Sequence, residues 1–236
     1  MKKISCIISA LNEGPRIGNV LKVVTNHLLI DEVIVIDDGS TDNTSKESLK
    51  FKGVRVIRHE KNMGKTKSML DGCNSSKNDL IMFLDADLYD LTFKDITELA
   101  KPVINGLVDM SIGMVKHDSR LYIIATIVGH GAYSGQRAMK KEIALKNLEK
   151  VKGFGAEAIM NQYVLDNNLR FIVVNWLNVK AVLRVKEIGF SKSFIYYIKT
   201  FKEIFQVVPP LKFIIQLLKM RKLSLKYEKN IKIYKN

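Results

Sequence analysis

The stretch "LIMFLDADLYD", Leu80–Asp90, indicates how the chain folds. Five apolar residues precede Asp85, and Asp87 follows after one intervening residue. A short apolar run of this kind is typical of a strand that is buried on both faces, as in a parallel sheet. The two acids would then lie at the carboxyl end of the strand, which is where open α/β sheets bind their ligands.

Short β-branched runs alternate with helical spacing through the first half of the chain. The predicted strands cover 3–11, 31–39, 54–60, 80–87 and 109–115, and the predicted helices cover 14–29, 43–51, 65–76 and 92–105. This alternation predicts an α/β protein with a Rossmann-like, mostly parallel sheet flanked by helices. We expect the sheet to be complete by about residue 115.

Composition limits the class of protein. The chain has 236 residues, 47% of them hydrophobic, which is enough for one sizeable core. Its two cysteines, Cys6 and Cys73, have no CxxC spacing, so neither a disulfide framework nor a zinc site is indicated. The N-terminus is predicted to be a strand and lacks the apolar core of a signal peptide. A cytoplasmic protein is therefore expected.

Positive charge is concentrated near the C-terminus. The net charge is +14, and residues 188–236 hold 11 Lys and Arg against 2 Glu, a net of +9. This segment is predicted to form a basic, amphipathic helical tail, with one apolar face that comprises Phe194, Ile198, Phe201, Phe205 and Val208. We expect it to lie on an anionic membrane surface at the inner face of the membrane. The alternative is that the apolar face packs on its own domain. No nucleic-acid-binding motif accompanies the charge.

Further polar clusters follow the other predicted strands. Asn12 and Glu13 follow the first strand and Asp38 follows the second. Two aspartates spaced as Asp85 and Asp87 are spaced can bind Mg²⁺ or Mn²⁺ through oxygen ligands. Carboxylates such as that of Asp38 can accept hydrogen bonds from a base and a ribose hydroxyl. The recurrence of these clusters at one sheet edge predicts a nucleotide site with a divalent cation.

Six short motifs carry a resemblance to a known family: "ALNEG", "VIVIDDGSTDNT", "NMGK", "FLDADL", "SGQRAMKKE" and "GFGAE". In this order and spacing the chain resembles family 2 glycosyltransferases of the GT-A fold over residues 1–187, and it looks most similar to the branch that contains dolichyl- and polyprenyl-phosphate sugar transferases. The resemblance implies transfer of a sugar from a UDP- or GDP-sugar to a lipid phosphate acceptor, with Mg²⁺ or Mn²⁺ and with inversion.

The resemblance also assigns residues. The nucleotide-binding residues it implies are Ala10, Leu11, Asn12, Glu13, Asp37, Asp38, Lys65 and Asp85. Asp85 and Asp87 match the metal-binding pair, with Asp87 the firmer ligand and a catalytic residue. Arg137 matches a residue on the acceptor or diphosphate side, and Glu157 matches an acceptor-side acid.

The sequence departs from the family pattern at some positions. Gly14 and Pro15 follow Asn-Glu where a second acid is usual, and the late histidine that completes the metal shell in some members has no counterpart; His117 and His130 are the remaining candidates. Two alternatives stay open. One is the same donor chemistry with a soluble acceptor or a polysaccharide, and the other is a non-catalytic module that binds a sugar nucleotide.

Overall fold

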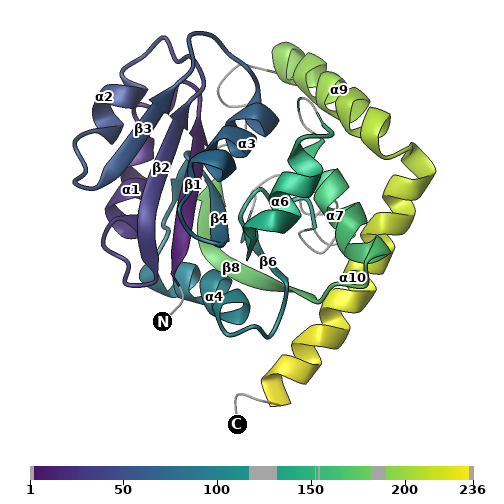
Figure 1. Cartoon of the computed structure of the whole chain (residues 1–236). Coiled ribbons are helices and arrows are strands. Elements are labelled where there is room, and N and C mark those ends of the chain that lie inside the picture. The colour runs from purple at the N-terminus through teal and green to yellow at the C-terminus, as the bar shows by residue number, and fades with distance from the viewer. Residues whose placement is uncertain (1–2, 117–131, 152, 154, 182–189, 234–236) are drawn as a thin grey trace.

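Figure 1 shows the computed structural model, which describes residues 3–116, 132–151, 153, 155–181 and 190–233. The strands are β1 (Ile4–Ala10), β2 (Ile30–Asp37), β3 (Val54–Arg58), β4 (Leu80–Asp85), β5 (Leu88–Tyr89), β6 (Met110–Lys116), β7 (Arg137–Lys140) and β8 (Phe171–Ala181). The helices are α1 (Ile17–Val24), α2 (Thr44–Ser48), α3 (Lys65–Ser75), α4 (Phe93–Ile104), α6 (Lys141–Leu148), α7 (Ala156–Asp166), α9 (Phe190–Val207) and α10 (Pro210–Ile233).

The strands form one mixed sheet in the order β3-β2-β1-β4-β7-β6-β8-β5. The first half of this order is parallel: β1 pairs with β2 and with β4, so that Ile7 faces Ile34 on one side and Phe83 on the other. β3 adds to the outer side of β2, also in parallel. The predicted α/β class with a mostly parallel sheet is confirmed.

The expectation that the sheet ends near residue 115 is wrong. β7 inserts between β4 and β6 and runs antiparallel to both, and β8 pairs with β6 in parallel. β7 has only four residues, which is too short for an alternating pattern to appear in the sequence. β8 includes the polar residues Asn175, Asn178 and Lys180, because only its first part is buried on both faces.

Buried side chains cover both faces of the sheet. Along β1, Cys6 and Ile8 join a core with α1 and α4, whereas Ile7 joins a second core with α3, α6 and α7. Figure 1 shows these helices on opposite sides of the strands. This arrangement explains the continuous apolar runs of the parallel strands. Neighbouring residues point to opposite faces of the sheet, and helices bury both faces.

The two C-terminal helices pack beside this sheet. α10 contacts β8 and α7, and its Met220 is buried in the second core. α9 begins two residues after the predicted boundary at 188, and the division of the chain at that point stays a prediction. Across the described ranges, no helix has the length and apolar character needed to cross a bilayer.

The apolar face predicted for residues 194–208 is divided between two environments. Val208 is buried and Phe205 is half-buried, in contact with their own domain. Ile198 and Phe201 are exposed. The side chain of Phe194 lies outside the described part of the structure.

Candidate active site

The carboxyl ends of β1, β2 and β4 meet at one edge of the sheet. Ala10 at the end of β1 pairs with Asp37 of β2, and Ser9 pairs with Asp85 of β4. The amide of Asp38 donates to the carbonyl of Ala10 at 2.8 Å, and Leu11 follows at the surface, half-buried. The structure therefore brings the polar clusters of three separate motifs to neighbouring positions.

The loops after β1 and β2 are joined by side-chain hydrogen bonds. The side-chain oxygen of Asn12 accepts from the amide of Thr41 at 2.8 Å, and the amide of Asn12 donates to the hydroxyl of Ser40 at 2.9 Å. The amide of Glu13 donates to the hydroxyl of Thr44 at 2.8 Å. Asn12 has a φ of 57°, in the left-handed region that asparagine tolerates better than most residues. These contacts fix the backbone of the predicted nucleotide loop.

Asp37 is fully buried and holds the second loop. Its carboxylate accepts from the amide of Ser40 at 2.8 Å, from the hydroxyl of Ser45, and from the Arg58 guanidinium at 2.7 Å. Burial acts to raise the pKa of Asp37, but the hydrogen bonds from Ser40 and Ser45 and the charge of Arg58 outweigh it and lower this pKa. Asp37 therefore stays ionised and organises the loop.

Asp38, predicted to contact base and ribose, supports the next loop in this structure. Its carboxylate accepts from the amides of Met63 and Gly64, both at 2.8 Å, and contacts Nδ1 of His59 at 2.7 Å. The other ring nitrogen of His59 contacts Asp71 of α3 at 3.0 Å. Sequence reasoning missed this role for His59, although its position three residues before Asn62 of the "NMGK" motif is a signal that could have suggested it. Asp38 thus fixes the segment that carries Lys65.

Lys65 links two predicted site residues that are far apart in the chain. Its ammonium lies 2.8 Å from Oδ1 of Asp85 and 3.3 Å from Oε1 of Glu157. Burial acts to lower the pKa of Lys65, but the charges of Asp85 and Glu157 outweigh it and raise this pKa. The ammonium is therefore kept charged between the end of β4 and the first turn of α7.

Gln136 is a further member of this cluster that sequence reasoning did not single out. Its amide group donates to Oδ2 of Asp85 at 2.7 Å and accepts from the Asp85 amide at 2.9 Å. Gly135 lies beside it, and a Cβ at that position would be 2.8 Å from the ammonium of Lys65 and 2.9 Å from Oδ2 of Asp85. The sequence signal for Gln136 was its place in the "SGQR" motif. The glycine of that motif lacks a Cβ, which allows the backbone to lie close to Lys65 and Asp85.

Asp87 lies two residues beyond Asp85, half-buried, with the buried Ala86 between them. The two carboxylates supply oxygen ligands of the type that Mg²⁺ and Mn²⁺ bind, so the donor set fits such an ion. Lys65 stands at 2.8 Å from one Asp85 oxygen, so an ion at that oxygen would displace the ammonium. Among the residues that the structure describes, no three His, Cys, Asp or Glu side chains already converge as a metal site. His117 and His130 lie outside the described residues.

Arg137 is completely buried, whereas the prediction placed it on the acceptor or diphosphate side of an open site. Its guanidinium donates to the carbonyls of Ser134 and Ala132, at 2.9 and 2.5 Å, and to the side chain of Asn161 at 2.8 Å. Burial lowers the pKa of Arg137 to about 10, partly opposed by the charge of Glu157. In this conformation Arg137 supports the segment before β7 from behind, and direct contact with a substrate stays a prediction.

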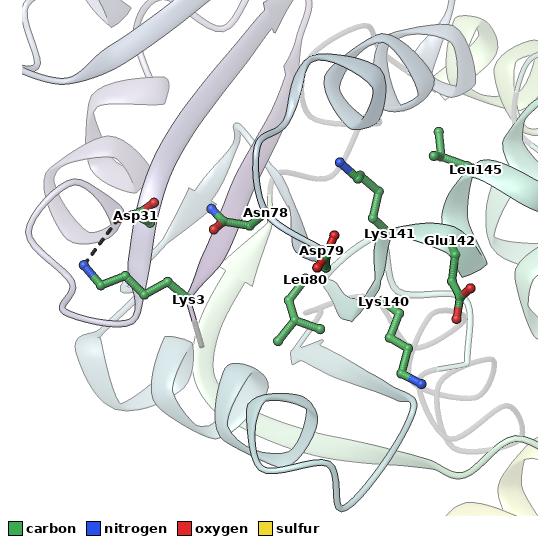
Figure 2. Close-up of a pocket in the computed structure, with 9 residues that line it drawn as sticks. All are labelled: Lys3, Asp31, Asn78, Asp79, Leu80, Lys140, Lys141, Glu142 and Leu145. Atoms are coloured by element: carbon green, nitrogen blue, oxygen red, sulfur yellow. Dashed lines mark hydrogen bonds and ion pairs between the residues drawn. The ribbon is translucent and has the colours of Figure 1, made fainter. Parts of the chain in front are cut away.

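A separate hollow of about 670 Å³ lies at the opposite edge of the sheet. Figure 2 shows its lining, which includes Asn78 before β4, Leu80 at the start of β4, Lys140 at the end of the antiparallel β7 and Lys141 at the start of α6. The Lys141 ammonium donates to the carbonyl of Ser76 at 3.0 Å. None of the predicted site residues lines this hollow.

The family model described as "Glycosyl transferase family 2" matches residues 5–169, which contain all of the motifs above. The chain belongs to this family. The predicted resemblance is thereby confirmed. The matched region includes Asp38, Lys65, Asp85 and Glu157, which lie at the carboxyl edge of the sheet.

Three curated relatives illustrate the range of this family. A glucosyl-3-phosphoglycerate synthase of Mycolicibacterium paratuberculosis is 30% identical over 114 residues, which is 44% of this chain and 34% of the relative. A dolichyl-phosphate beta-glucosyltransferase of Mus musculus is 34% identical over 124 residues, 46% of this chain and 37% of the relative. A dodecaprenyl-phosphate galacturonate synthase of Rhizobium johnstonii is 27% identical, over 49% of this chain and 36% of the relative. The matches thus span about a third of the length of these relatives.

Solved structures share the fold. Glucosyl-3-phosphoglycerate synthase from Mycobacterium tuberculosis, in complex with Mn²⁺, UDP and glucosyl-3-phosphoglycerate, superposes with a TM-score of 0.65 at 23% identity over 80% of this chain and 75% of that chain. A complex of the same enzyme with phosphoglyceric acid gives 0.69 at 21% identity over 87% of this chain and 79% of that chain. At this identity the likeness confirms the predicted GT-A fold.

Proposed function

We propose that the chain transfers a sugar from a UDP- or GDP-sugar to a lipid phosphate, polyprenyl phosphate in particular. The observation that carries the proposal is the cluster at the carboxyl edge, in which Lys65 bridges Asp85 and Glu157. Asp87 lies directly beyond it. The Lys65 ammonium at the end of the central strands, beside carboxylates that can hold a divalent cation, suits a negatively charged donor that is bound at this edge.

The donor side is assigned to the loops that follow β1, β2 and β4. Asp85 and Asp87 would hold Mg²⁺ or Mn²⁺, and the ion would supply positive charge against the leaving nucleoside diphosphate. Lys65 supplies a second positive charge at the same place, and it can turn from the Asp85 carboxylate to a phosphate oxygen. Asp38 would position the segment that carries Lys65 while the nucleotide binds.

Glu157 is assigned to the acceptor side, at the first turn of α7. An acceptor phosphate is already ionised near neutral pH, so its oxygen can attack the anomeric carbon without a strong base. Glu157 would then orient the acceptor, and attack from the face opposite the departing diphosphate would invert the anomeric centre. With a hydroxyl acceptor, the same carboxylate would accept the proton instead.

A lipid phosphate is favoured for two reasons. Two of the curated relatives are named for dolichyl phosphate and dodecaprenyl phosphate. In addition, residues 188–236 carry a net charge of +9, which suits a membrane whose inner face is anionic. The chain would accordingly work at the inner face of the membrane without crossing it.

A soluble phosphorylated acceptor is the second candidate. It is favoured by one specific observation, the 30% identity to a glucosyl-3-phosphoglycerate synthase. The donor half of the site would be the same in both cases, and the difference would lie in the segments that follow β6.

The two acceptors can be separated directly. The full chain would be incubated with Mn²⁺ and labelled UDP-glucose, UDP-glucuronic acid or GDP-mannose, with either detergent-dispersed polyprenyl phosphate or 3-phosphoglycerate. We expect label to enter the organic phase only with the lipid. Label that appears solely in an acidic, water-soluble product would assign the soluble acceptor.

The same assay tests whether the chain is only a binding module. The Asp87→Ala variant should lose transfer with every donor while it remains folded. If neither wild type nor variant turns over any donor, yet both bind nucleotide equally, the non-catalytic alternative holds.

A further inference from the structure

Helix α10 has two apolar faces, and the inner one is fixed to the domain. Met220 is buried in the second core, and Leu217 and Leu223 are packed against it. The buried Gln216 donates to the carbonyl of Ala158 in α7 at 3.1 Å and accepts from the hydroxyl of Tyr133. These contacts hold the helix in one orientation about its axis.

The outer face is also apolar, and it is exposed. Its members are Leu211, Ile214, Ile215, Leu218 and Leu225, with between 42% and 71% of each residue exposed to solvent. Their spacing of three, four and seven residues places them in one stripe along the helix, because each residue advances about 100° around the axis. An exposed apolar stripe of this length marks an interaction surface.

Basic side chains border the stripe. Lys212, Lys219 and Lys226 recur every seven residues, which puts them in a row along one side, and Arg221 lies on the other side. All four are exposed. Between residues 210 and 227 the sequence has no Asp or Glu. Lys222 is also exposed, and its position around the helix axis places it within the stripe. The outer face is therefore an apolar stripe that contains one lysine and has a strongly positive border.

Helix α9 continues the same character. Its described side chains include Ile195, Ile198 and Phe201, with exposed fractions of 68%, 54% and 46%. Phe205 of α9 meets Phe213 of α10 edge to face, with 5.6 Å between ring centroids. Figure 1 shows the two helices joined at an angle along one side of the molecule.

We propose that the outer stripe of α10 docks on the headgroup region of an anionic lipid bilayer, with its apolar side chains inserted and its basic border on lipid phosphates. Lysine suits this border because its aliphatic stem can follow the apolar surface while its ammonium reaches the headgroups. The proposal deepens the proposed function and rests on its membrane location, because it names the surface that would contact the membrane; that surface makes no use of the residues at the carboxyl edge.

Two other occupants fit the stripe less well. A second copy of α10 would bring rows of lysine against like rows, with no acidic side chain between 210 and 227 to neutralise them. A nucleic acid would be bound by the positive border, but it would leave five exposed aliphatic side chains without a role. A bilayer satisfies both the charge and the apolar surface.

Vesicle flotation of the full chain tests the proposal. Vesicles of phosphatidylcholine would be compared with vesicles that also contain phosphatidylglycerol, and only the latter should carry the protein. The variant L211S/I214S/I215S/L218S should reduce the bound fraction by more than about tenfold. The variant K212Q/K219Q/K226Q should reduce binding by about 100-fold.

Matched controls use side chains of the same type elsewhere on the surface. The exposed Leu28, Leu49 and Leu107 would be changed to Ser, and the exposed Lys46, Lys52 and Lys94 to Gln. Both controls should float as wild type does. Thermal unfolding of every variant confirms that the fold is intact, since only exposed side chains are replaced.

Two results would overturn the proposal. One is equal flotation of wild type and both outer-face variants. The other is a stable dimer, seen by sedimentation, that the L211S/I214S/I215S/L218S variant abolishes while no form binds anionic vesicles. Nucleotide binding to the same samples is measured in parallel, so that failure of the docking surface is distinguished from failure of the donor site.

Discussion

Lys65 and Asp85 form an ion pair of 2.8 Å that joins the start of α3 to the end of β4. In the sheet, β2 and β1 lie between β3, which precedes the Lys65 segment, and β4, so the pair joins elements that are not neighbouring strands. Asp38 fixes the segment before Lys65 through the amides of Met63 and Gly64. A donor phosphate that approaches this edge would meet a positive charge that is already positioned.

Replacement of Lys65 by Gln should lower both activity and stability. Asp85 and Glu157 would lose the cation that lies between them, so we expect a loss of about 1–2 kcal/mol in the free energy of unfolding and at least about a 100-fold loss in kcat/KM. Urea unfolding and the transfer assay measure the two effects. Lys77→Gln, at an exposed position outside the cluster, is the control and should behave as wild type. Normal turnover by Lys65→Gln would contradict the assignment.

Asp87→Asn should abolish metal-dependent nucleotide binding with little effect on folding. Asp87 is half-buried at the sheet edge, and removal of its charge takes away one of the two proposed carboxylate ligands. Calorimetric titration with UDP and Mn²⁺ should show a loss of at least about tenfold in affinity. Asp90→Asn is matched to it, because Asp90 is exposed and has a φ of 59° that asparagine also adopts. If Mn²⁺ strengthens UDP binding to both variants equally, Asp87 is not a ligand.

Stability should fall in acid partly because of Asp37. The folded-state pKa of Asp37 lies below its ordinary value of 3.8, so its contribution is fully present above the unfolded pKa and is lost as the pH falls through the folded pKa. Wild type should therefore lose stability below about pH 4. Asp37→Asn should be less stable at pH 7 and should show a shallower decline between pH 5 and pH 3. Urea unfolding at each pH provides the comparison, and parallel declines would exclude this role.

Gly155→Ala should disturb the packing of α9 on the start of α7. A Cβ at Gly155 would lie 2.6 Å from Cγ2 of Val207 and 2.6 Å from Cγ1 of Val151, closer than such atoms approach. We expect a loss of about 1–3 kcal/mol in the free energy of unfolding. The double variant Gly155→Ala/Val207→Ala should recover part of it, as a double-mutant cycle would show. Gly18→Ala is the control, because its Cβ would meet Phe51 at an ordinary 3.7 Å.

The sequence predicted the half of the fold that contains β1 to β4 well, for a physical reason. β1, β2 and β4 are buried on both faces, so their apolar runs stand out, and a parallel sheet necessarily collects the acids that follow them at one edge. The prediction of Asp85, Asp87 and Lys65 as neighbours of one site depended on this rule together with the family resemblance.

The half of the fold that begins with β6 was less predictable. β7 is too short to show a period, and its antiparallel direction depends on contacts with β4 and β6 rather than on its own residues. The partners of Asp38 and Arg137 are likewise tertiary. His59 is 21 residues from Asp38 in the sequence, and Asn161 is 24 residues from Arg137. Contacts between residues so far apart leave no local sequence pattern.

The order of the elements along the chain also divides the candidate site into two parts. The four strands β1 to β4 are complete before residue 86, whereas Gln136 and Glu157, which contact Asp85 and Lys65, follow β6 in the chain. Under the proposed function, a change downstream of residue 116 could alter the acceptor only if the contacts of Gln136 with Asp85 and of Glu157 with Lys65 are kept.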